Sequence, residues 1–511
     1  MSRTIIVGGG LAGLAAAVAL AERGLPVTLL ESRPRLGGRA SSFVDHRTGE
    51  TIDNCQHVAM GCCTNFLHFC RSVGADGLLR EERELFFIGR DNCVHRFAES
   101  RLPAPLHLWP AFRRLSGLSR VDLRGIGRGL RELARTSPAA LRGRAFSDWL
   151  DEQRQTPAAA ESFWRVVLVS ALSETLDRID ASHARKVFVD GFLASRQGWR
   201  VHIPRAPLEE LYGDRLQHRL SGLGATVRLQ TGAERLEIEG DRAASVELRG
   251  GERVAGEQFI LAVPHHLVLP LLPETLRTGP QLARVAALES APISSVHLWF
   301  DRPITDLPHA VFVERLSQWM FNRNAVWSGA TDGTASDSSH SQLSTLNSQL
   351  SYYQIVISAS RELGGRTQDE IVAHVVRELS EVWPQAAAAG LVRSRVVTEH
   401  RAVFSPTPGC DELRPPQQSP IANVQLAGDW TQTGWPATME GAVRSGYLAA
   451  ENVLAHFGRR ERLVQPDLPT AWLARLLLGL QTEPGNHHTK VPNHGAGSHS
   501  CRMRTPPSWP S

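Results

Sequence analysis

The sequence predicts an α/β protein in which a Rossmann-like domain, a parallel sheet with a β-meander, is interleaved with an α+β domain. Three observations lead to this prediction. A strand–helix–strand pattern with a glycine-rich turn occupies residues 4–31, and a strand end followed by a helix occupies residues 426–454. Strand-like segments at 225–264 lie between them and return the chain to the first domain. A chain of 511 residues also exceeds what one ordinary core accommodates.

The first element is a βαβ unit. Residues 4–7 are an apolar run typical of a buried strand, residues 11–23 have the alanine-rich composition of a packed helix, and residues 27–30 predict a second strand. This order of elements, with a glycine-rich turn after the first strand, is typical of a dinucleotide-binding unit.

The turn of this unit carries Gly8, Gly10 and Gly13 at the G-x-G-x-x-G spacing. Such glycines permit a tight turn, the close approach of a pyrophosphate and close packing of helix on strand. Residues 11–12, Leu11 and Ala12, begin the helix, whose N-terminus faces the phosphates with its positive dipole end. Glu31 ends the second strand, where a carboxylate accepts hydrogen bonds from ribose hydroxyls.

A basic, glycine-containing turn follows immediately. Arg33, Gly37, Gly38 and Arg39 bring backbone N–H groups and guanidinium groups to the same side as Glu31. A solvated basic turn is the alternative, but its position directly after the acid favours contact with the phosphates.

A similar arrangement of strand, turn and helix is predicted near the C-terminus. Gly428 and Asp429 follow a short apolar run, and Pro436 suits the first turn of a helix that we expect to continue to about residue 454. The segments 31–39 and 426–442 together resemble the two cofactor motifs of the FAD enzymes of the amine oxidase and phytoene desaturase superfamily.

This resemblance implies FAD as the cofactor and assigns roles to the C-terminal motif. Asp429 would bind the ribityl and phosphate region, and the helix N-terminus at Thr438, Met439 and Ala442 would face the flavin. The backbone of Ala233 would touch the adenine.

The resemblance also implies the domain organisation. Segments 225–230, 233–239 and 258–264 are interpreted as the β-meander. The FAD-binding domain is predicted from residues 1–90, 215–270 and 400–458, and the substrate domain from 91–214 and 271–399, with a flexible insertion at 325–351, a possible interfacial helix at 459–480 and a disordered tail at 481–511.

Two positions argue against an amine substrate. Amine oxidases of the superfamily carry a lysine near the reactive flavin nitrogen, and the matching position here is Ser295. They also present a tyrosine from the C-terminal motif, and the matching position is Thr438. The chain has two lysines, Lys186 and Lys490, and neither lies near a motif.

The segment 53–61 resembles a different branch, the hydroxysqualene dehydroxylases, also called squalene-associated FAD-dependent desaturases. Where that family most often has glycine, this chain has Cys55. The resemblance covers roughly residues 1–455 and extends to the segments 170–174, 203–208, 317–323 and 353–359. It implies the reductive loss of an allylic hydroxyl that converts hydroxysqualene to squalene, in squalene and hopanoid biosynthesis, and an upstream hydroxysqualene synthase as a possible partner.

Candidate catalytic residues follow from that reaction. His57, Asp53 and Glu174 are candidates for protonating the leaving hydroxyl, and a structural role is the alternative for each of them. Aromatic faces stabilise a delocalised cation, which makes the side chains Trp299, Trp319 and Phe321 candidates as well.

The cysteine-rich stretch 55–70 does not predict a metal site. Cys55, Cys62, Cys63 and Cys70 lack paired zinc-ligand spacing, and adjacent cysteines do not bridge comfortably. We interpret them as small buried hydrophobic side chains and expect no metal.

Three other functions stay open: a carotenoid-type desaturase or isomerase, a flavin amine oxidase, and a prenyl-binding escort-like protein without flavin chemistry. A net charge of +4 gives no indication of nucleic acid binding. With no secretory signal and no long apolar run, we expect a cytoplasmic protein that holds a C30 isoprenoid. The segments 103–115 and 468–480 mix apolar and basic residues and are candidates for peripheral contact with the inner membrane face.

Overall fold

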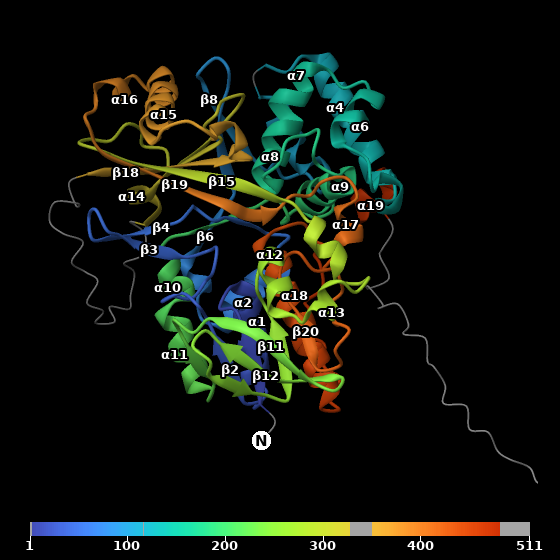
Figure 1. Ribbon diagram of the computed structural model, residues 1–511. Coiled ribbons are helices and arrows are strands. Elements are labelled where there is room, and N and C mark those ends of the chain that lie inside the picture. The colour runs from blue at the N-terminus through green and yellow to red at the C-terminus, as the bar shows by residue number, and fades with distance from the viewer. Residues whose placement is uncertain (1–2, 116, 328–349, 481–511) are drawn as a thin grey trace, which may run out of the picture. The chain divides into compact units, whose positions relative to one another are not determined.

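A five-stranded parallel sheet carries the glycine-rich turn (Figure 1). The computed structural model describes residues 3–115, 117–327 and 350–480. The strand order is β10 (Thr226–Arg228), β2 (Val27–Leu30), β1 (Thr4–Val7), β14 (Gln258–Leu261) and β20 (Val424–Leu426), and all four neighbouring pairs are parallel. Strands that are far apart in the sequence thus meet in one sheet, as the predicted Rossmann-like fold requires.

Two long helices pack against one face of this sheet. Every residue of α1 (Leu11–Ala21) is buried, because small alanine side chains let α18 (Met439–His456) approach closely. A Cβ atom on Gly446 of α18 would lie 2.2 Å from the carbonyl oxygen of Ala12, so only glycine fits at this crossing. The helix α11 (Asp214–Gly222) and the short helix α2 (Thr64–Ser72) complete this layer.

The opposite face of the parallel sheet is covered by the β-meander, which consists of β11 (Ala233–Glu239), β12 (Arg242–Leu248) and β13 (Arg253–Ala255). The meander prediction was therefore right for 233–239 and wrong for the other two segments. Residues 225–230 and 258–264 contribute β10 and β14 to the parallel sheet instead. Their short apolar runs did not distinguish an alternating strand from a fully buried one.

The second part of the fold is a mixed seven-stranded sheet. Its strand order is β19 (Leu391–Phe404), β15 (Ser290–Phe300), β18 (Ser351–Ser358), β17 (Trp319–Asn322), β16 (His309–Phe312), β7 (Glu84–Ile88) and β8 (Val94–Ala98). The helices α15 (Gln368–Val382) and α16 (Pro384–Ala388) bury their apolar faces against it.

A helical layer lies beside this sheet. It contains α4 (Arg120–Arg135), α5 (Pro138–Leu141), α6 (Phe146–Glu152), α7 (Pro157–Ala159), α8 (Val166–Leu172) and α9 (Ala181–Phe188). Its core is aromatic, with Trp149 and Trp164 buried and in edge contact. The short helix α19 (Trp472–Leu478) packs against α4.

The remaining elements connect these layers. They are β3 (Ser42–Asp45), β4 (Glu50–Asp53), β5 (Ala59–Met60), β6 (Leu79–Glu82), β9 (Val201–Pro204), α3 (Trp109–Phe112), α10 (Leu208–Tyr212), α12 (His265–Val268), α13 (Glu274–Arg277), α14 (Arg323–Trp327) and α17 (Cys410–Leu413). Among the described residues, no helix is long and apolar enough to cross a bilayer.

The α/β fold class is confirmed, whereas the domain boundaries stay a prediction, because residues 1–480 form one compact unit. Two helix boundaries differ from those predicted from the sequence. The second cofactor helix begins at Met439 rather than at Pro436, since Thr438 caps it. The predicted interfacial helix is restricted to Trp472–Leu478. Most of the 325–351 insertion and all of the 481–511 tail lie outside the described residues.

Candidate functional site

One large cavity, of about 860 Å³, connects the glycine-rich turn with the seven-stranded sheet and the helical layer. Its volume lies in the range of about 300–1,000 Å³ that small-molecule sites occupy. One end is lined by backbone from β1, α1 and the turn after β2, and the other end is lined mostly by apolar and aromatic side chains. The cavity therefore has a polar end and an apolar end.

At the polar end, Glu31 organises the backbone around the α1 N-terminus. Its two carboxylate oxygens accept hydrogen bonds from the N–H groups of Gly9 and Arg33, each at 2.7 Å. The carboxylate is buried and lines the cavity, where a ribose hydroxyl can use the remaining acceptor capacity.

Close approach of two turns shapes the same end. Gly38 has a φ of +63°, and a Cβ atom on it would lie 3.0 Å from the Cα atom of Gly10. A Cβ on Gly13 would lie 2.0 Å from the carbonyl oxygen of Gly8. These glycines keep a backbone cradle open beside the positive end of α1, and the cradle fits a pyrophosphate.

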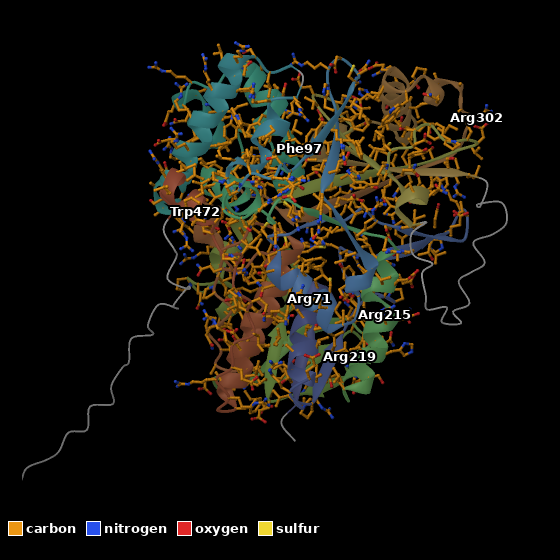
Figure 2. All side chains as sticks on the ribbon, turned by 180° about the vertical axis from the view of Figure 1, so that it is seen from behind. Arg71, Phe97, Arg215, Arg219, Arg302 and Trp472 are labelled. Atoms are coloured by element: carbon orange, nitrogen blue, oxygen red, sulfur yellow. The ribbon has the colours of Figure 1, made fainter. Side chains whose placement is uncertain are left out.

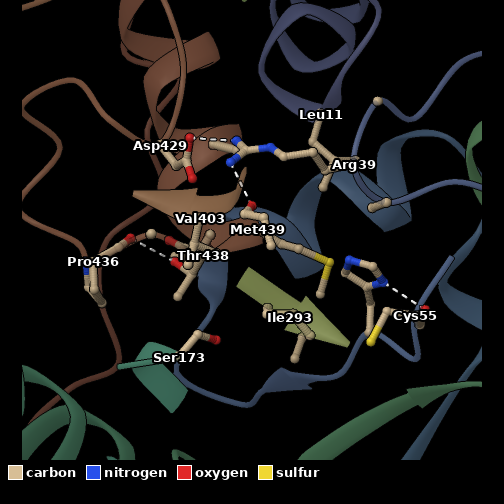
Figure 3. A pocket seen from close by; sticks show the side chains of 18 of the residues that line it. Leu11, Arg39, Cys55, Ser173, Ile293, Val403, Asp429, Pro436, Thr438 and Met439 are labelled. Atoms are coloured by element: carbon tan, nitrogen blue, oxygen red, sulfur yellow. Dashed lines mark hydrogen bonds and ion pairs between the residues drawn. The ribbon is translucent and has the colours of Figure 1, made fainter. Parts of the chain in front are cut away.

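An ion pair at the cavity wall joins the N-terminal cofactor motif to the C-terminal one (Figure 3). The Nη2 atom of Arg39 lies 2.7 Å from Oδ1 of Asp429, and its Nη1 donates to the carbonyl oxygen of Ala402 at 2.7 Å. Asp429 is buried, whereas Arg39 remains half-buried. This pair fixes the C-terminal motif against the turn that follows β2.

The N-terminus of α18 opens onto the cavity. Thr438 is its cap, and Oγ1 of Thr438 accepts from the N–H of Gly441 at 3.1 Å. Thr438, Met439 and Ala442 line the wall, so the positive end of the helix dipole points at whatever occupies this part of the cavity.

The predicted cofactor residues come together at this cavity. All of them except Gly13 line it: Gly8, Gly10, Leu11, Ala12, Glu31, Arg33, Gly37, Gly38, Arg39, Ala233, Gly428, Asp429, Thr438, Met439 and Ala442. Gly13 lies behind the wall, where it allows α1 to pack on the β1 turn. The individual binding role of each residue stays a prediction.

The apolar end is built from side chains of both layers. Phe112, Phe163 and Val166 come from the helical side, and Trp319 and Phe321 come from β17. The rings of Trp319 and Phe321 are stacked, with centroids 5.5 Å apart and planes within 5°. Such a wall suits an elongated hydrocarbon.

Trp299 does not belong to this wall, contrary to expectation. It stacks on Tyr352, with centroids 4.6 Å apart, and the guanidinium of Arg393 lies 4.0 Å from its ring centroid. The strand pairing places Trp299 on the same face of the sheet as Trp319, but six residues farther along β15 than Ile293, which lines the cavity. The sequence alone did not determine this position.

Asp53 is placed as a structural residue. Its carboxylate is buried, ion-paired with Arg323 at 2.6 Å, and accepts hydrogen bonds from Ser42 Oγ at 2.7 Å and from the N–H of Leu208 at 2.9 Å. It is not part of the cavity wall. These contacts give no support to the hypothesis that Asp53 protonates substrate, which stays a prediction.

Glu174 is also bound elsewhere. Its carboxylate has no exposed surface, pairs with Arg361 and with Arg178, and accepts a hydrogen bond from Ser405 Oγ. It does not line the cavity. Both carboxylate oxygens are engaged by these partners away from the cavity, so the geometry gives no support to a catalytic role of Glu174.

His57 does line the cavity. Its Nδ1 atom lies 3.0 Å from the carbonyl oxygen of Cys55 (Figure 3). Burial lowers the pKa of His57, against the opposing effect of that hydrogen bond, so the ring is neutral at pH 7. With Nδ1–H donating to the carbonyl, Nε2 is a hydrogen-bond acceptor.

Lys186 is a site residue that the sequence analysis dismissed. It lines the cavity, and its Nζ atom lies 4.7 Å from the ring centroid of Trp435, directly before the α18 cap segment. Burial alone would lower the pKa of Lys186, but Asp190 and Asp467 outweigh this effect and raise it. The Asp190 partner, four residues along the helix, was the one local signal of an ordered lysine.

The lysine position of amine oxidases is buried in polar contacts. Ser295 Oγ accepts from Gln354 Nε2 at 2.8 Å, lies 3.3 Å from His297 Nε2, and interacts with the thiol of Cys55. Burial raises the pKa of Cys55 to about 12, so this thiol stays protonated. Neither group supplies a cation at the cavity.

The cysteine-rich stretch forms no disulfide among its described thiols, and burial raises the pKa of Cys70 to about 12. Elsewhere in the described residues, one histidine, one cysteine and one aspartate lie close together: His183, Cys410 and Asp411. Arg414 Nη1 lies 2.8 Å from Asp411 Oδ1, so the cluster is a salt-bridged contact between α9 and α17.

Comparison with known proteins agrees with this geometry. Residues 11–454 match the family described as flavin containing amine oxidoreductase. The chain is 25% identical over 487 residues to 15-cis-phytoene desaturase of Synechococcus elongatus, with 90% of this chain and 97% of that protein covered. It is 25% identical over 478 residues to the chloroplastic/chromoplastic 15-cis-phytoene desaturase of Narcissus pseudonarcissus, with 89% and 79% covered.

A solved structure shows the same fold. Cyclohexylamine oxidase from Brevibacterium oxydans IH-35A is 18% identical, with a TM-score of 0.62, 90% of this chain covered and 100% of that chain. The cofactor is FAD, and the protein is an FAD-dependent oxidoreductase. Because the family match spans most of the sequence and includes both cofactor motifs, the chain belongs to the flavin containing amine oxidoreductase family.

Proposed function

We propose that this oxidoreductase converts hydroxysqualene to squalene and receives its substrate from an upstream hydroxysqualene synthase. The observation that carries the proposal is the cation of Lys186 in the wall of the cavity, beside Trp435 and the flavin-facing helix. The proposed substrate matches this arrangement, because it is a long hydrocarbon with one hydroxyl group. The resemblance of segment 53–61 to hydroxysqualene dehydroxylases supports the same substrate.

The reaction needs a hydride at carbon and a proton on the departing hydroxyl oxygen, and it releases water. The flavin, when bound in its reduced form, supplies the hydride. The chain supplies the rest: the Trp319 and Phe321 faces hold the hydrocarbon and stabilise positive charge on it, and Lys186 donates a hydrogen bond to the oxygen.

The ion pairs of Lys186 provide a route for protons from solvent. Its Nζ atom pairs with Asp190 and lies 3.5 Å from Oδ2 of Asp467, whose side chain is 41% exposed. Asp467 also pairs with Arg444, which lies 5.4 Å from the Trp435 ring centroid. A proton given up by Lys186 is thus replaced without opening the apolar end of the cavity.

A carotenoid-type desaturase is the second candidate, and the relatives found by comparison favour it. The two relatives described above are 15-cis-phytoene desaturases, each 25% identical over most of this chain. The structure offers one feature in its support: neutral His57 presents an acceptor nitrogen, which suits removal of a proton from a hydrocarbon. An isomerase would use the same cavity.

The test is anaerobic and compares hydride transfer from the reduced flavin with hydride transfer to the oxidised flavin. Purified holoenzyme with its flavin reduced by dithionite is mixed with hydroxysqualene, and flavin reoxidation is followed with lipid products. Squalene formed in step with reoxidation supports the dehydroxylase. Flavin that stays reduced, together with reduction of oxidised enzyme by phytoene, would replace the proposal with the desaturase.

Two variants separate the roles of the polar residues. Lys186→Met should lower dehydroxylation by about 10²-fold while flavin content is kept, and Lys186→Arg should recover part of it. His57→Gln, which keeps an acceptor but no base, should leave dehydroxylation nearly unchanged. The reverse pattern would assign the chemistry to His57 and favour the desaturase.

A further inference from the structure

One face of α4 carries a stripe of arginines. Arg120, Arg124, Arg128, Arg131 and Arg135 are all exposed, and their spacing of four, four, three and four residues places them on the same side of the helix. The opposite side is buried in the aromatic core of the helical layer. Over 16 residues, the stripe extends for about 24 Å.

These arginines have almost no acidic partners. Among the described residues, none of the first four forms an ion pair, and Arg135 donates only to the carbonyl oxygen of Leu477, at 3.4 Å. Asp122 is buried in the N-terminal capping box, which leaves Glu132 as the exposed acid of α4.

Some exposed arginines on other elements are paired, for example Arg83 with Glu81, Arg235 with Glu237 and Arg302 with Asp301. An unpaired stripe of like charge destabilises itself unless an anionic surface meets it.

An apolar ridge adjoins the end of this stripe. Trp472 and Leu476 lie one turn apart on α19 and are 69% and 70% exposed, the highest values among the large hydrophobic side chains described. Figure 2 shows Trp472 at the outer edge of the protein. The next highest value, 65%, belongs to Val121, which lies on α4 beside Arg120. The buried face of α19 holds it in place, since Ala474 and Leu478 pack into a small apolar cluster.

The same cluster leads to the cavity. Val189 and Leu193 pack against α19, while Phe192, from the same helical turn, lines the cavity wall. The segment 189–193 therefore lies between the buried face of α19 and the apolar end of the cavity.

We propose that α4 and α19 form a docking surface for an anionic lipid bilayer, the arginines contacting lipid phosphates and the Trp472–Leu476 ridge entering the interface. Tryptophan beside basic residues is the composition of interfacial helices. A nucleic acid or an acidic protein would match the arginines but leave the ridge exposed to water. The surface stands independently of the reaction catalysed, because it rests on residues outside the cavity.

Vesicle co-sedimentation of the full-length holoprotein tests this surface. Binding is measured on phosphatidylcholine vesicles and on vesicles that also contain phosphatidylglycerol, at low and high salt. The triple variant Arg124→Gln, Arg128→Gln, Arg131→Gln should bind the anionic vesicles about a hundredfold more weakly, since each basic residue near such a surface contributes about fivefold.

Controls keep the test specific. The triple variant Arg47→Gln, Arg277→Gln, Arg366→Gln has the same net charge and removes exposed arginines from other elements. It should bind as the unchanged protein does. Trp472→Ser with Leu476→Ser should weaken binding to both vesicle types, with the salt dependence kept.

Three results would overturn the proposal: equal loss in both arginine triples, no preference for anionic vesicles, or tighter and equally arginine-dependent binding to a nucleic acid. All variants should keep their flavin content, which reports that the fold is intact.

Discussion

The ion pair of Asp53 with Arg323 gives the sharpest prediction, because both side chains are almost fully buried, at 1% and 0% exposure. In Asp53→Asn, the guanidinium of Arg323 loses the one carboxylate partner it has among the described residues, and its contact with Trp327, at 4.2 Å from the ring centroid, does not replace it. Breaking one side of a buried pair costs about 3–5 kcal/mol. Unfolding a unit of about 480 residues changes the entropy by about 1 kcal/mol per kelvin, so we expect Tm to fall by about 3–5 °C.

The assay is thermal unfolding of the holoprotein with flavin release as a second signal. Glu50→Gln is the matched control, because Glu50 lies on the same strand and its pair with Arg393 is partly exposed, which limits its contribution to about 1 kcal/mol. Asp53→Leu with Arg323→Met should recover most of the loss, since an apolar pair of similar volume replaces a buried ion pair well. An Asp53→Asn protein with unchanged Tm and flavin content but no turnover would refute the structural role.

Three further predictions follow from the same physical arguments. Gly38→Ala should lose most of its flavin, measured as the ratio of visible to ultraviolet absorbance, because the new Cβ meets Gly10; Gly49→Ala, which has a φ of +72° but no atom within 4 Å, should keep it. Iodoacetamide at pH 8 should label exposed Cys93 and leave buried Cys62 and Cys70 unmodified, as read by peptide mass spectrometry, and labelling of Cys70 in the native protein would contradict its burial. Burial would lower the pKa of His183, but hydrogen bonds to Asp411 and Cys410 raise it from 6.5 to about 9. The protonated ring therefore stabilises the folded state fully below pH 6.5, and this stabilisation is lost as the pH rises through 9. We expect Tm to fall over that range, and His183→Gln should remove this fall.

The cofactor end of the cavity was predictable from the sequence because its geometry is local. The βαβ spacing, Glu31 and the C-terminal Gly428–Asp429 turn each have a conformational or electrostatic reason that acts within a few residues. The Arg39–Asp429 pair spans 390 positions, yet both partners were found because each belongs to a recognisable turn.

The apolar end was less predictable, because tertiary packing decides which side chains face it. Trp299 and Trp319 are both strand tryptophans next to apolar residues, and both lie on the same face of the sheet. The cavity covers only part of that face, so it includes Trp319 and leaves out Trp299. Asp53 and Glu174 were plausible acids from the sequence, because their cationic partners, Arg323 and Arg361, come from distant segments of the chain.

Lys186 shows how the charges of the cavity constrain the proposed chemistry. An ammonium group close to a developing allylic cation would destabilise it, whereas the aromatic faces of Trp319 and Phe321 would stabilise it. The two carboxylates beside Lys186 reduce this conflict, because Asp190 and Asp467 offset its charge at longer range. An ammonium has three N–H donors, and these two partners leave one for a substrate oxygen. Such an arrangement suits a substrate with a hydroxyl group to lose and has no evident use for a pure hydrocarbon, which is why Lys186→Met distinguishes the two candidate reactions more sharply than any change at His57.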